Sequence, residues 1–268
     1  MRAKKSLGQN FLRDQTIIKR IIDALDLGHD ETVIEIGPGQ GALTEQLFID
    51  EAKVIAIEFD RDMISLLHER FGSLHNFHLI NEDALNVDFS DVLKANAVDA
   101  KAKLIANLPY NISTPILQRL MDQRHLFSSL VLMFQREVVE RITAKAGGKE
   151  RGFLSVMVEN TFNTEYLFDV PPQAFQPVPK VWSAVVRLTP KSSLIADEAL
   201  FRQIISFCFL QKRKTILNNL KTRFPNAAVF LEQCEIDGMR RAETLTLCEW
   251  VKLVSAIKRA GSSIDVRP

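Results

Sequence analysis

Residues 35–47 read EIGPGQGALTEQL, and this stretch decides the fold of the chain. It joins an apolar run, which ends in VIEI, to a segment with helical spacing, and Gly37, Gly39 and Gly41 stand at alternate positions within it. Glycine lets a backbone turn tightly and lets a bound group approach it closely. The stretch therefore predicts a strand–turn–helix unit, which serves either as a plain connection or as one wall of a ligand site.

Short apolar runs alternate with helical patterns on both sides of this turn. The expected strands are TVIEIG (32–37), KVIAIEF (53–59), FHLINED (77–83), AKLIANL (102–108) and SLVLMFQ (129–135). Helical patterns lie at 42–50 and 61–71, and an earlier one at 15–27 places five apolar residues on one stripe: Ile17, Ile18, Ile21, Ile22 and Leu25. This alternation predicts an α/β fold with a parallel sheet and helices on both faces.

The second half of the chain changes character. Residues 144–152, AKAGGKERG, predict a mobile loop, and a proline-rich irregular segment precedes a strand-like run, VWSAVVRL. A further helix should start after Asn111, capped by Ser113 or Thr114, with Pro115 in its first turn. Residues 189–197 form a polar linker, and 198–260 have the pattern of short helices without a strand. We therefore expect a main α/β domain at 1–190 and a small all-helical domain at 191–268.

The composition excludes several classes of protein. The 268 residues are 46% hydrophobic and 25% charged, which is typical of a soluble globular chain. There is no apolar run of about 18 residues that could span a membrane, and no secretory signal follows the basic start. The three cysteines lie among apolar residues without CxxC spacing: Cys208, Cys234 and Cys248. We expect reduced core thiols, no metal site and a cytoplasmic location.

The net charge of +1 conceals a strong asymmetry along the chain. Residues 29–103 hold fifteen acids and six bases, whereas 199–231 hold six bases and no acid, and the first twenty residues are also basic. This division indicates a small-ligand region with basic flanks for a polyanion, although solvated basic helix faces would give the same counts. The candidate contacts to such a polyanion are Arg2, Lys4, Lys5, Lys212, Arg213, Lys214, Lys221 and Arg223.

Acidic residues end the next two expected strands. Glu58 stands 21 residues after Gly37, where a carboxylate can accept hydrogen bonds from both ribose hydroxyls. Asp83 ends the third strand, where a carboxylate can accept from an adenine amino group. Because the carboxyl ends of neighbouring parallel strands share one edge, we expect these residues and the glycine turn to form one pocket.

Two cofactors compete for this pocket. A dinucleotide site requires G-x-G-x-x-G to seat a pyrophosphate on the helix N-terminus, but this chain has G-x-G-x-G. The turn is also preceded by Glu35, which is unfavourable for a phosphate. An acid at this position suits the cationic methionine end of S-adenosylmethionine, which is therefore the cofactor that we expect.

The fourth strand ends in Asn107-Leu108-Pro109-Tyr110, NLPY, beside this pocket. The amino nitrogen of adenine is a poor nucleophile, since its lone pair is delocalised into the ring. The amide oxygen of Asn107 and the carbonyl of Leu108, aimed by Pro109, can accept hydrogen bonds from that amino group and orient it. Tyr110 offers a face for a flipped-out base. The alternative is a strand-to-helix turn with a buried tyrosine.

Five segments together resemble one known family, the ribosomal RNA adenine dimethyltransferases, and most closely its small-subunit (16S) branch. The segments are SLGQNFL, EIGPGQG, NEDAL, NLPYNIST and AFQPVPKVWSAVVRL. The resemblance covers essentially the whole chain. It implies a Rossmann-like class I methyltransferase sheet of seven strands, with an antiparallel last strand and a C-terminal helical domain. It also implies dimethylation of N6 on two adjacent adenines in the 3′-terminal hairpin loop of 16S rRNA, during small-subunit assembly.

The resemblance also assigns roles to residues. The turn, the strand ends and the family motifs together give the expected cofactor contacts: Asn10, Leu12, Glu35, Gly37, Gly39, Gly41, Glu58, Asp83, Ala84 and Asn107. Phe175 occupies the place of a family aromatic that sandwiches the target base, or it is a hydrophobic plug. The family leads us to expect a proline after Arg240, and the chain has Arg241 instead, so the local turn there is in doubt.

Two rival functions remain open at this point. A related 23S rRNA methyltransferase that confers macrolide resistance shares the pocket, whereas the basic QKRKTILNNL segment (211–220) favours the small-subunit substrate. A non-catalytic binding or assembly factor would have no need for an intact set of pocket residues. We expect a monomer that acts on an assembly intermediate of the small ribosomal subunit.

Overall fold

A computed structural model of the chain describes residues 9–48, 52–109, 112–193, 195 and 197–261. Four residues with predicted roles, Arg2, Lys4, Lys5 and Tyr110, lie outside these ranges. The chain forms two compact units. Unit 1 comprises Met1–Val139 and Asn163–Pro190, and unit 2 comprises Glu140–Phe162 and Lys191–Pro268.

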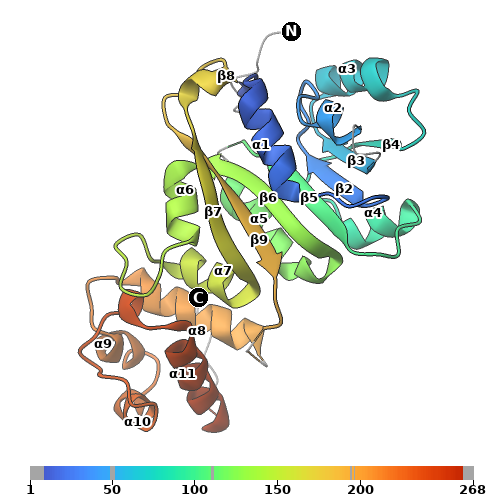
Figure 1. Ribbon diagram of the computed structural model, residues 1–268. Helices are drawn as coiled ribbons and strands as arrows, with labels where there is room; N and C mark the ends of the chain where they lie inside the picture. The colour runs from blue at the N-terminus through green and yellow to red at the C-terminus, as the bar shows by residue number, and fades with distance from the viewer. Residues whose placement is uncertain (1–8, 49–51, 110–111, 194, 196, 262–268) are drawn as a thin grey trace. The chain divides into compact units, whose positions relative to one another are not determined.

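Unit 1 is built on a seven-stranded sheet with the order β4-β3-β2-β5-β6-β9-β7 (Figure 1). The strands are β2 (Thr32–Ile36), β3 (Lys53–Glu58), β4 (Phe77–Asn81), β5 (Ala102–Asn107), β6 (Phe127–Gln135), β7 (Phe162–Val170) and β9 (Ser183–Pro190). β2 to β6 pair in parallel, and β9 is antiparallel to β6. The five strands expected from the apolar runs are confirmed, as is the α/β methyltransferase-like fold.

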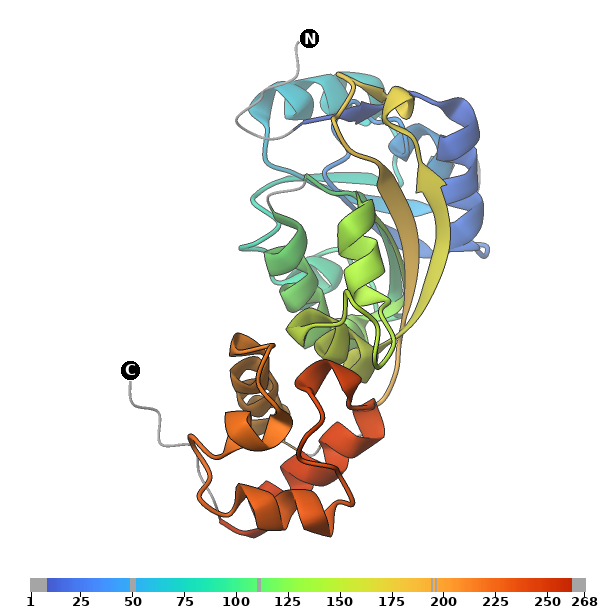
Figure 2. The same cartoon turned by 90° about the vertical axis from the view of Figure 1, so that its left-hand side faces the viewer.

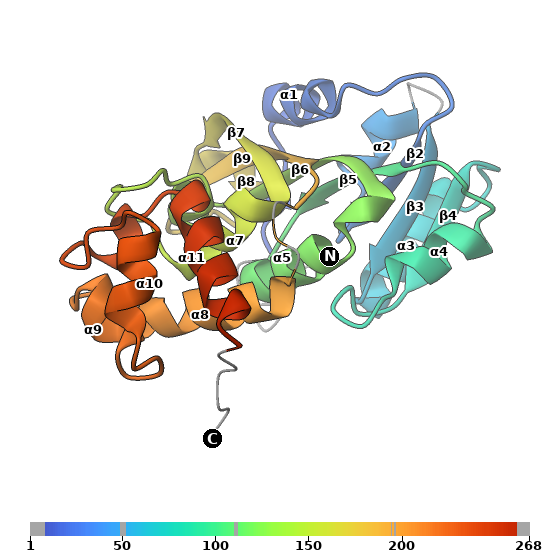
Figure 3. The ribbon, with the colours of Figure 1, turned by 90° about the horizontal axis from the view of Figure 1, so that it is seen from below.

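The helices of unit 1 connect these strands. They are α1 (Gln15–Leu25), α2 (Thr44–Leu47), α3 (Arg61–Phe71), α4 (Phe89–Ala95), α5 (Ser113–Asp122), a 3-10 turn η4 (Arg124–Leu126) and the start of α6 (Arg136–Ile142). α1 and α5 lie on opposite faces of the sheet (Figure 3). The predicted cap of α5 is wrong: its N-cap is Ile112 without a side-chain bond, because Ser113 is already helical and its hydroxyl donates to the Pro109 carbonyl at 3.4 Å.

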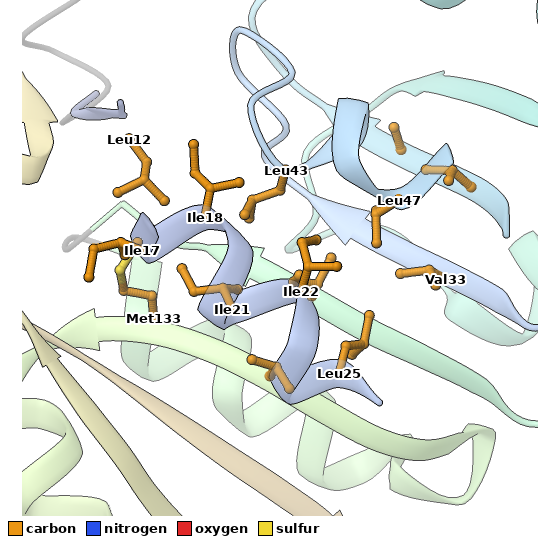
Figure 4. Close-up of a cluster of buried hydrophobic side chains, with 14 of the residues drawn as sticks. Leu12, Ile17, Ile18, Ile21, Ile22, Leu25, Val33, Leu43, Leu47 and Met133 are labelled. Carbon is orange, nitrogen blue, oxygen red and sulfur yellow. The ribbon is translucent and has the colours of Figure 1, made fainter. Parts of the chain in front are cut away.

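The stripe on α1 anchors one face of the sheet. All five residues of the predicted stripe are buried, and they join side chains from α2, α3 and the strands in one apolar cluster (Figure 4). Asp14 begins the helix, since its carboxylate accepts from the backbone N–H groups of Thr16 and Ile17 at 2.9 and 3.1 Å. Asp14 thereby fixes the start of α1 directly after residues 9–13.

A second, two-stranded sheet was not expected from the sequence. β1 (Phe11–Leu12) pairs antiparallel with β8 (Phe175–Gln176), so that Leu12 lies opposite Phe175. The Arg13 N–H adds a hydrogen bond to the Ala174 carbonyl at 2.8 Å. The short η5 turn (Pro172–Ala174) leads into β8. These contacts join residues 11–13 to the proline-rich segment.

Unit 2 is helical (Figure 2). It contains the end of α6, α7 (Phe153–Thr161), α8 (Glu198–Leu210), α9 (Ile216–Leu220), α10 (Ala227–Gln233), the η6 turn (Ala242–Thr244) and α11 (Leu247–Arg259). The turn before η6, where the chain has Arg241 in place of the expected proline, is held by an Arg240–Glu249 ion pair and by an isolated antiparallel β-bridge between Thr215 and Arg241. The predicted helical region after residue 198 is confirmed for the described residues.

The expected division into 1–190 and 191–268 differs from the observed units. Residues 140–162 group with the C-terminal helices, because α7 is almost wholly buried and packs against α8 and α11. Arg151 is fully buried in this unit, where its guanidinium donates to the Ala144 and Leu245 carbonyls and pairs with Glu159 at 2.7 Å. The loop at 144–152 is further held by a hydrogen bond from Gly147 N–H to the Glu243 carbonyl at 2.8 Å.

The cysteines match the prediction in part. Cys208 and Cys234 are buried and free, but Cys248 is exposed on α11. Burial raises the pKa of the Cys208 thiol to about 12. The described part of the chain contains no cluster of three or more His, Cys, Asp or Glu side chains that could hold a metal ion. Among the same residues, no helix is long and apolar enough to cross a membrane.

Candidate active site

A cavity of about 540 Å³ opens at the carboxyl edge of the unit 1 sheet. Eleven of the predicted site residues line it: Asn10, Leu12, Glu35, Gly37, Gly39, Glu58, Asp83, Asn107, Leu108, Pro109 and Phe175. The volume is within the range of small-molecule and cofactor sites. The structure thus brings together residues from the N-terminal segment, four strand ends and the proline-rich segment.

Gly41 and Ala84 do not line this cavity. Gly41 has a left-handed φ of 81°, and a Cβ atom there would lie 2.6 Å from the ring of Phe71. Its lack of a side chain therefore allows α3 to pack against the turn. Ala84 is buried directly after Asp83. For both residues the structure provides a packing role, and their contact with a cofactor is left as a prediction.

The glycine turn forms one side of the cavity. Gly37 and Gly39 also have positive φ values, 66° and 55°, which L side chains rarely adopt. The Gly37 N–H donates to the Ile57 carbonyl at 2.9 Å and so fixes the start of the turn beside β3. At Gly39 the backbone closely approaches the ring of Phe11, since a Cβ there would lie 3.1 Å from its Cε1 atom.

Glu58 organises the backbone around the end of β3. Its Oε1 accepts from the N–H groups of Phe59 and Asp60 at 2.9 and 2.8 Å, and its Oε2 accepts from Gly39 at 3.1 Å. Burial raises the pKa of this carboxyl, and the three N–H groups oppose that shift. A carboxylate offers about four acceptor positions, so the three backbone bonds leave room for a hydroxyl of a ligand.

Glu35 lies fully buried under the turn, with 1% of its surface exposed. Burial raises its pKa from 4.5 to about 7, a shift that the hydrogen bond from Thr44 opposes and the nearby Glu58 carboxylate reinforces. The Thr44 hydroxyl donates to Glu35 Oε2 at 2.6 Å. A buried acid of this kind favours a cationic ligand group, because the cation would stabilise its ionised form.

The end of β5 is held from both sides. Asn107 Nδ2 donates to the Asn10 carbonyl at 3.4 Å, which leaves Oδ1 as the amide atom that can accept from a ligand. The Leu108 N–H donates to the Met133 carbonyl at 3.3 Å, and the Pro109 carbonyl accepts from the Ile112 N–H at 3.3 Å. These bonds fix the backbone on both sides of the Leu108 carbonyl, as the predicted orienting role requires.

Asp83 follows β4 at the same edge. Its Oδ1 accepts from the Leu85 N–H at 2.9 Å, and its carbonyl accepts from the Asn86 N–H at 2.8 Å. The aspartate is therefore held in a tight turn while its side chain lines the cavity. Phe175 also contributes to the wall, although it is only 3% exposed and belongs to the apolar cluster beneath α1. This burial is compatible with both of its predicted roles.

Sequence reasoning missed several residues of the wall, namely Gln9, Arg13, Gln40, Phe59 and Arg70. Arg13 Nη2 donates to the Gln40 side chain at 2.5 Å, and the guanidinium of Arg70 donates to the Gln40 carbonyl. Phe59 is 58% exposed where it lines the cavity. Gln9, Arg13 and Phe59 could have been found, since they adjoin predicted residues in GQNFLRD and IEFD.

The predicted RNA contacts that the structure describes lie in unit 2. Lys212, Arg213, Lys214, Lys221 and Arg223 are all exposed. Lys212 lies beside the 144–152 loop, because its Nζ is 3.6 Å from the Cβ position of Gly152. The Arg223 guanidinium lies over the ring of Phe207 at 5.7 Å. Unit 2 thus carries basic side chains at 212–223.

Comparison with known proteins identifies the family. The family model described as "Ribosomal RNA adenine dimethylase" matches residues 1–259. The chain belongs to the ribosomal RNA adenine dimethylase family. It is 40% identical over 259 residues to a ribosomal RNA small subunit methyltransferase A of Pseudomonas fluorescens, covering 96% of this chain and 94% of the relative. Another such methyltransferase, from Syntrophotalea carbinolica, is 44% identical over 263 residues, with 96% and 97% coverage.

Solved structures agree with this assignment. A dimethyladenosine transferase from Plasmodium falciparum has a TM-score of 0.79 at 27% identity, covering 95% of this chain and 99% of that one. The 23S rRNA methyltransferase ErmE has a TM-score of 0.72 at 25% identity, with 93% and 100% coverage. This member of the ribosomal RNA adenine dimethylase family is an S-adenosylmethionine-dependent rRNA methyltransferase with a class I α/β fold and a helical C-terminal region.

The cavity fits this cofactor rather than a dinucleotide. Glu35 and Glu58 are both buried in this wall, and the charge of Glu35 directly beneath the glycine turn is unfavourable for a pyrophosphate seated there. The same acids suit a ligand with hydroxyls and a cationic end. These acceptor groups agree with the family assignment, which favours S-adenosylmethionine over a dinucleotide.

Proposed function

We propose that this enzyme transfers methyl groups from S-adenosylmethionine to N6 of two adjacent adenines in the 3′-terminal hairpin loop of 16S rRNA, dimethylating each. The observation that carries the proposal is the position of Asn107. Its amide nitrogen is engaged by the Asn10 carbonyl, so that its oxygen is the atom presented to a ligand in the cavity. Relatives named small subunit methyltransferase A, 40–44% identical over nearly the whole chain, support the choice of rRNA.

The reacting adenine is oriented by acceptors rather than activated by a base. Asn107 Oδ1 and the Leu108 carbonyl accept the two hydrogens of the exocyclic amino group, which aims the nitrogen lone pair out of the ring plane. The bound cofactor supplies an electrophilic methyl group on a sulfonium. The proton leaves N6 after attack has made the nitrogen cationic, so no strong base is needed. Pro109 restricts Leu108 to an extended conformation and keeps its carbonyl aimed.

The cofactor would be held by the residues of the glycine turn and the strand ends. Glu58 accepts from a ribose hydroxyl at the acceptor position that its backbone bonds leave open. Asp83 accepts from the adenine amino group, and Glu35 stabilises the ammonium of the methionine end. Asn10, Leu12, Gly37 and Gly39 also line the cavity and would complete the wall around the cofactor.

The target base requires two further surfaces. Tyr110 follows Pro109 directly and would stack on the adenine that has left the hairpin loop. Phe175, in the wall of the same cavity, would cover the other face of that adenine. Phe175 is only 3% exposed, so an entering base would have to uncover more of its ring. Substitution of Phe175 by Leu should then raise the KM for RNA while cofactor affinity stays the same.

The rest of the RNA would be bound through its phosphates. The exposed basic residues 212–214, with Lys221 and Arg223, supply cations on unit 2, and the basic N-terminal residues supply a second group. We propose that the substrate is an assembly intermediate of the small ribosomal subunit, that the enzyme acts as a monomer, and that it works in the cytoplasm, where ribosomal subunits are assembled.

One experiment separates the candidate substrates. Labelled S-adenosylmethionine is offered with undermethylated small subunits, with large subunits and with naked rRNA, and the modified bases are mapped. The proposal predicts label on two adjacent adenines of the small-subunit RNA. Label on 23S rRNA alone would instead support the activity named for ErmE, whose fold this chain shares at 25% identity. RNA binding without any transfer would indicate an assembly factor.

A further inference from the structure

Trp182 is an exposed aromatic residue whose backbone is fixed. It precedes β9 directly, and its carbonyl accepts from the Arg136 N–H at 2.9 Å. The following residue, Ser183, is buried and pairs with Gln135 at the end of β6. The indole itself is 44% exposed, whereas the other tryptophan of the chain, Trp250, is 0% exposed in the core of unit 2. Backbone bonds hold the loop, so the exposed ring remains to be explained.

The register of the sheet places Trp182 near the site of methyl transfer. Asn107 pairs with Met133 on β6, and Met133 pairs with Val185 on β9. Two strand spacings separate β5 from β9, which amounts to about 10 Å. Trp182 lies three residues before Val185, and because β9 is antiparallel to β6, these residues extend beyond the carboxyl edge where the cavity opens. β6 and β9 are seen side by side in Figure 1.

The other end of the same loop is part of the cavity. The loop starts after Phe175 and Gln176, and Phe175 lines the wall where the target adenine would lie. Leu12 pairs with Phe175, so this end is also fixed by backbone bonds. A loop that contains Pro177 and Pro179, and is held by backbone bonds at both ends, therefore runs from the cavity wall to Trp182.

The surroundings of Trp182 combine apolar surface with positive charge. Val178 and Val181 are 62% and 42% exposed, and Lys180 between them is also exposed. An aromatic face beside a cation is the combination that binds an unpaired nucleotide, because the base stacks while the cation contacts its phosphate. An apolar contact to a protein would not need an exposed lysine between the two valines. Continuity with the cavity wall also favours the RNA substrate as the occupant.

We propose that Trp182 is a stacking platform for the unpaired nucleotide next to the target adenine. This inference rests on the proposed function, in which two adjacent adenines are methylated in turn. While one adenine is at Asn107, its neighbour stacks on the indole, and Lys180 contacts the phosphate beside it. Trp182 thus contributes to the choice of RNA site and takes no part in cofactor binding.

The test compares three substitutions in the full-length enzyme with undermethylated small ribosomal subunits. Trp182→Leu keeps an apolar side chain without a ring, Trp182→Phe restores an aromatic face, and Tyr166→Leu alters an aromatic residue that is 38% exposed on β7. We expect Trp182→Leu to raise the KM for subunits roughly tenfold, since base–aromatic stacking contributes about that much to affinity. Trp182→Phe should stay within about threefold of wild type, and Tyr166→Leu should have no effect.

Cofactor affinity, measured by calorimetry without RNA, should be the same in all variants, which shows that each one is folded around the cavity. The proposal is overturned if Trp182→Leu keeps the wild-type KM for subunits. It is also overturned if Trp182→Leu and Trp182→Phe have the same KM. If both variants have a KM near that of the wild type, the exposed indole would instead be a surface for apolar contact with a protein. If the wild-type enzyme does not methylate small subunits, the proposed function fails, and this inference fails with it.

Discussion

Leu12 and Phe175 lie opposite each other in a two-residue antiparallel ladder, and both side chains line the cavity at the carboxyl edge of the sheet. This pairing connects the N-terminal segment with the proline-rich segment, which are far apart in the sequence. Each of these strands is too short to be stable alone, so the ladder depends on the apolar cluster beneath it. The proposed cofactor wall at Leu12 and the proposed target-base wall at Phe175 are therefore parts of one small structure.

Substitution of Leu12 should thus affect both stability and cofactor binding. Leu12→Ala and Ile22→Ala each remove a buried aliphatic side chain, 3% and 8% exposed, from the same cluster. Each should lower the free energy of unfolding by about 2–4 kcal/mol, as measured by urea denaturation. Only Leu12→Ala should also raise the Kd for S-adenosylmethionine, because Ile22 does not line the cavity. Equal cofactor affinities in the two variants would show that the ladder is not part of the binding wall.

The raised pKa of Glu35 makes stability depend on pH. An acid whose pKa rises on folding, here from 4.5 to about 7, holds its proton more tightly in the folded state. The free energy of unfolding should therefore fall as pH increases from about 4.5 to 7, by on the order of 3 kcal/mol from this residue. Glu35→Gln, which mimics the protonated acid, should be more stable than wild type at pH 7.5 and should lose this part of the dependence.

Cofactor binding should depend on pH in the opposite direction. The ammonium of S-adenosylmethionine favours ionised Glu35, so affinity should increase between pH 6 and pH 7.5, and binding near pH 7 should release a proton. Calorimetry in buffers of different ionisation enthalpy measures that proton. Glu35→Gln should bind the cofactor more weakly and with no such pH dependence. A wild-type Kd that is unchanged across this range would place the cationic end of the cofactor elsewhere.

The basic residues of unit 2 should determine the salt dependence of RNA binding. The triple substitution of Lys212, Arg213 and Lys214 by alanine removes three exposed cations. The slope of log K against log salt should become shallower by about 2–3, since each phosphate contact contributes about 0.7–0.9. Lys94→Ala, which removes an exposed lysine in the acidic part of unit 1, should leave the slope unchanged. An unaltered slope in the triple variant would mean that the RNA is bound by another surface.

Much of unit 1 could be predicted because its central strands are buried on both faces and are therefore continuous apolar runs. The edge strand β7, FNTEYLFDV, was missed because most of its residues are partly or fully exposed and its pattern is mixed. β1 and β8 are too short to give a periodic signal. The contribution of 140–162 to unit 2 was also missed. It depends on contacts such as that between Arg151 and Leu245, which are far apart in the sequence, and neither local pattern indicates the other segment as a partner.

In the site, too, the features that follow from local sequence could be predicted, whereas contacts between distant segments could not. Glu58 and Asp83 could be placed because the position of a strand end in the sequence gives its position on the sheet edge. The Arg13–Gln40 hydrogen bond could not, since it joins two segments by side-chain geometry alone. The three backbone N–H groups that converge on Glu58 were likewise invisible in the sequence. They show that this acid holds the turn in place as well as lining the cavity.

The central claim is that Asn107 orients the adenine nitrogen for methyl transfer, and single-turnover transfer by Asn107→Ala tests it most directly. Tritiated S-adenosylmethionine at saturating concentration is mixed with excess enzyme and undermethylated small subunits, and RNA binding is measured in parallel. We predict that the transfer rate falls at least about 100-fold, because the variant loses a preorganised polar contact to the reacting group. The RNA affinity should change by less than about threefold. Tritium transfer at the wild-type rate would contradict the mechanism.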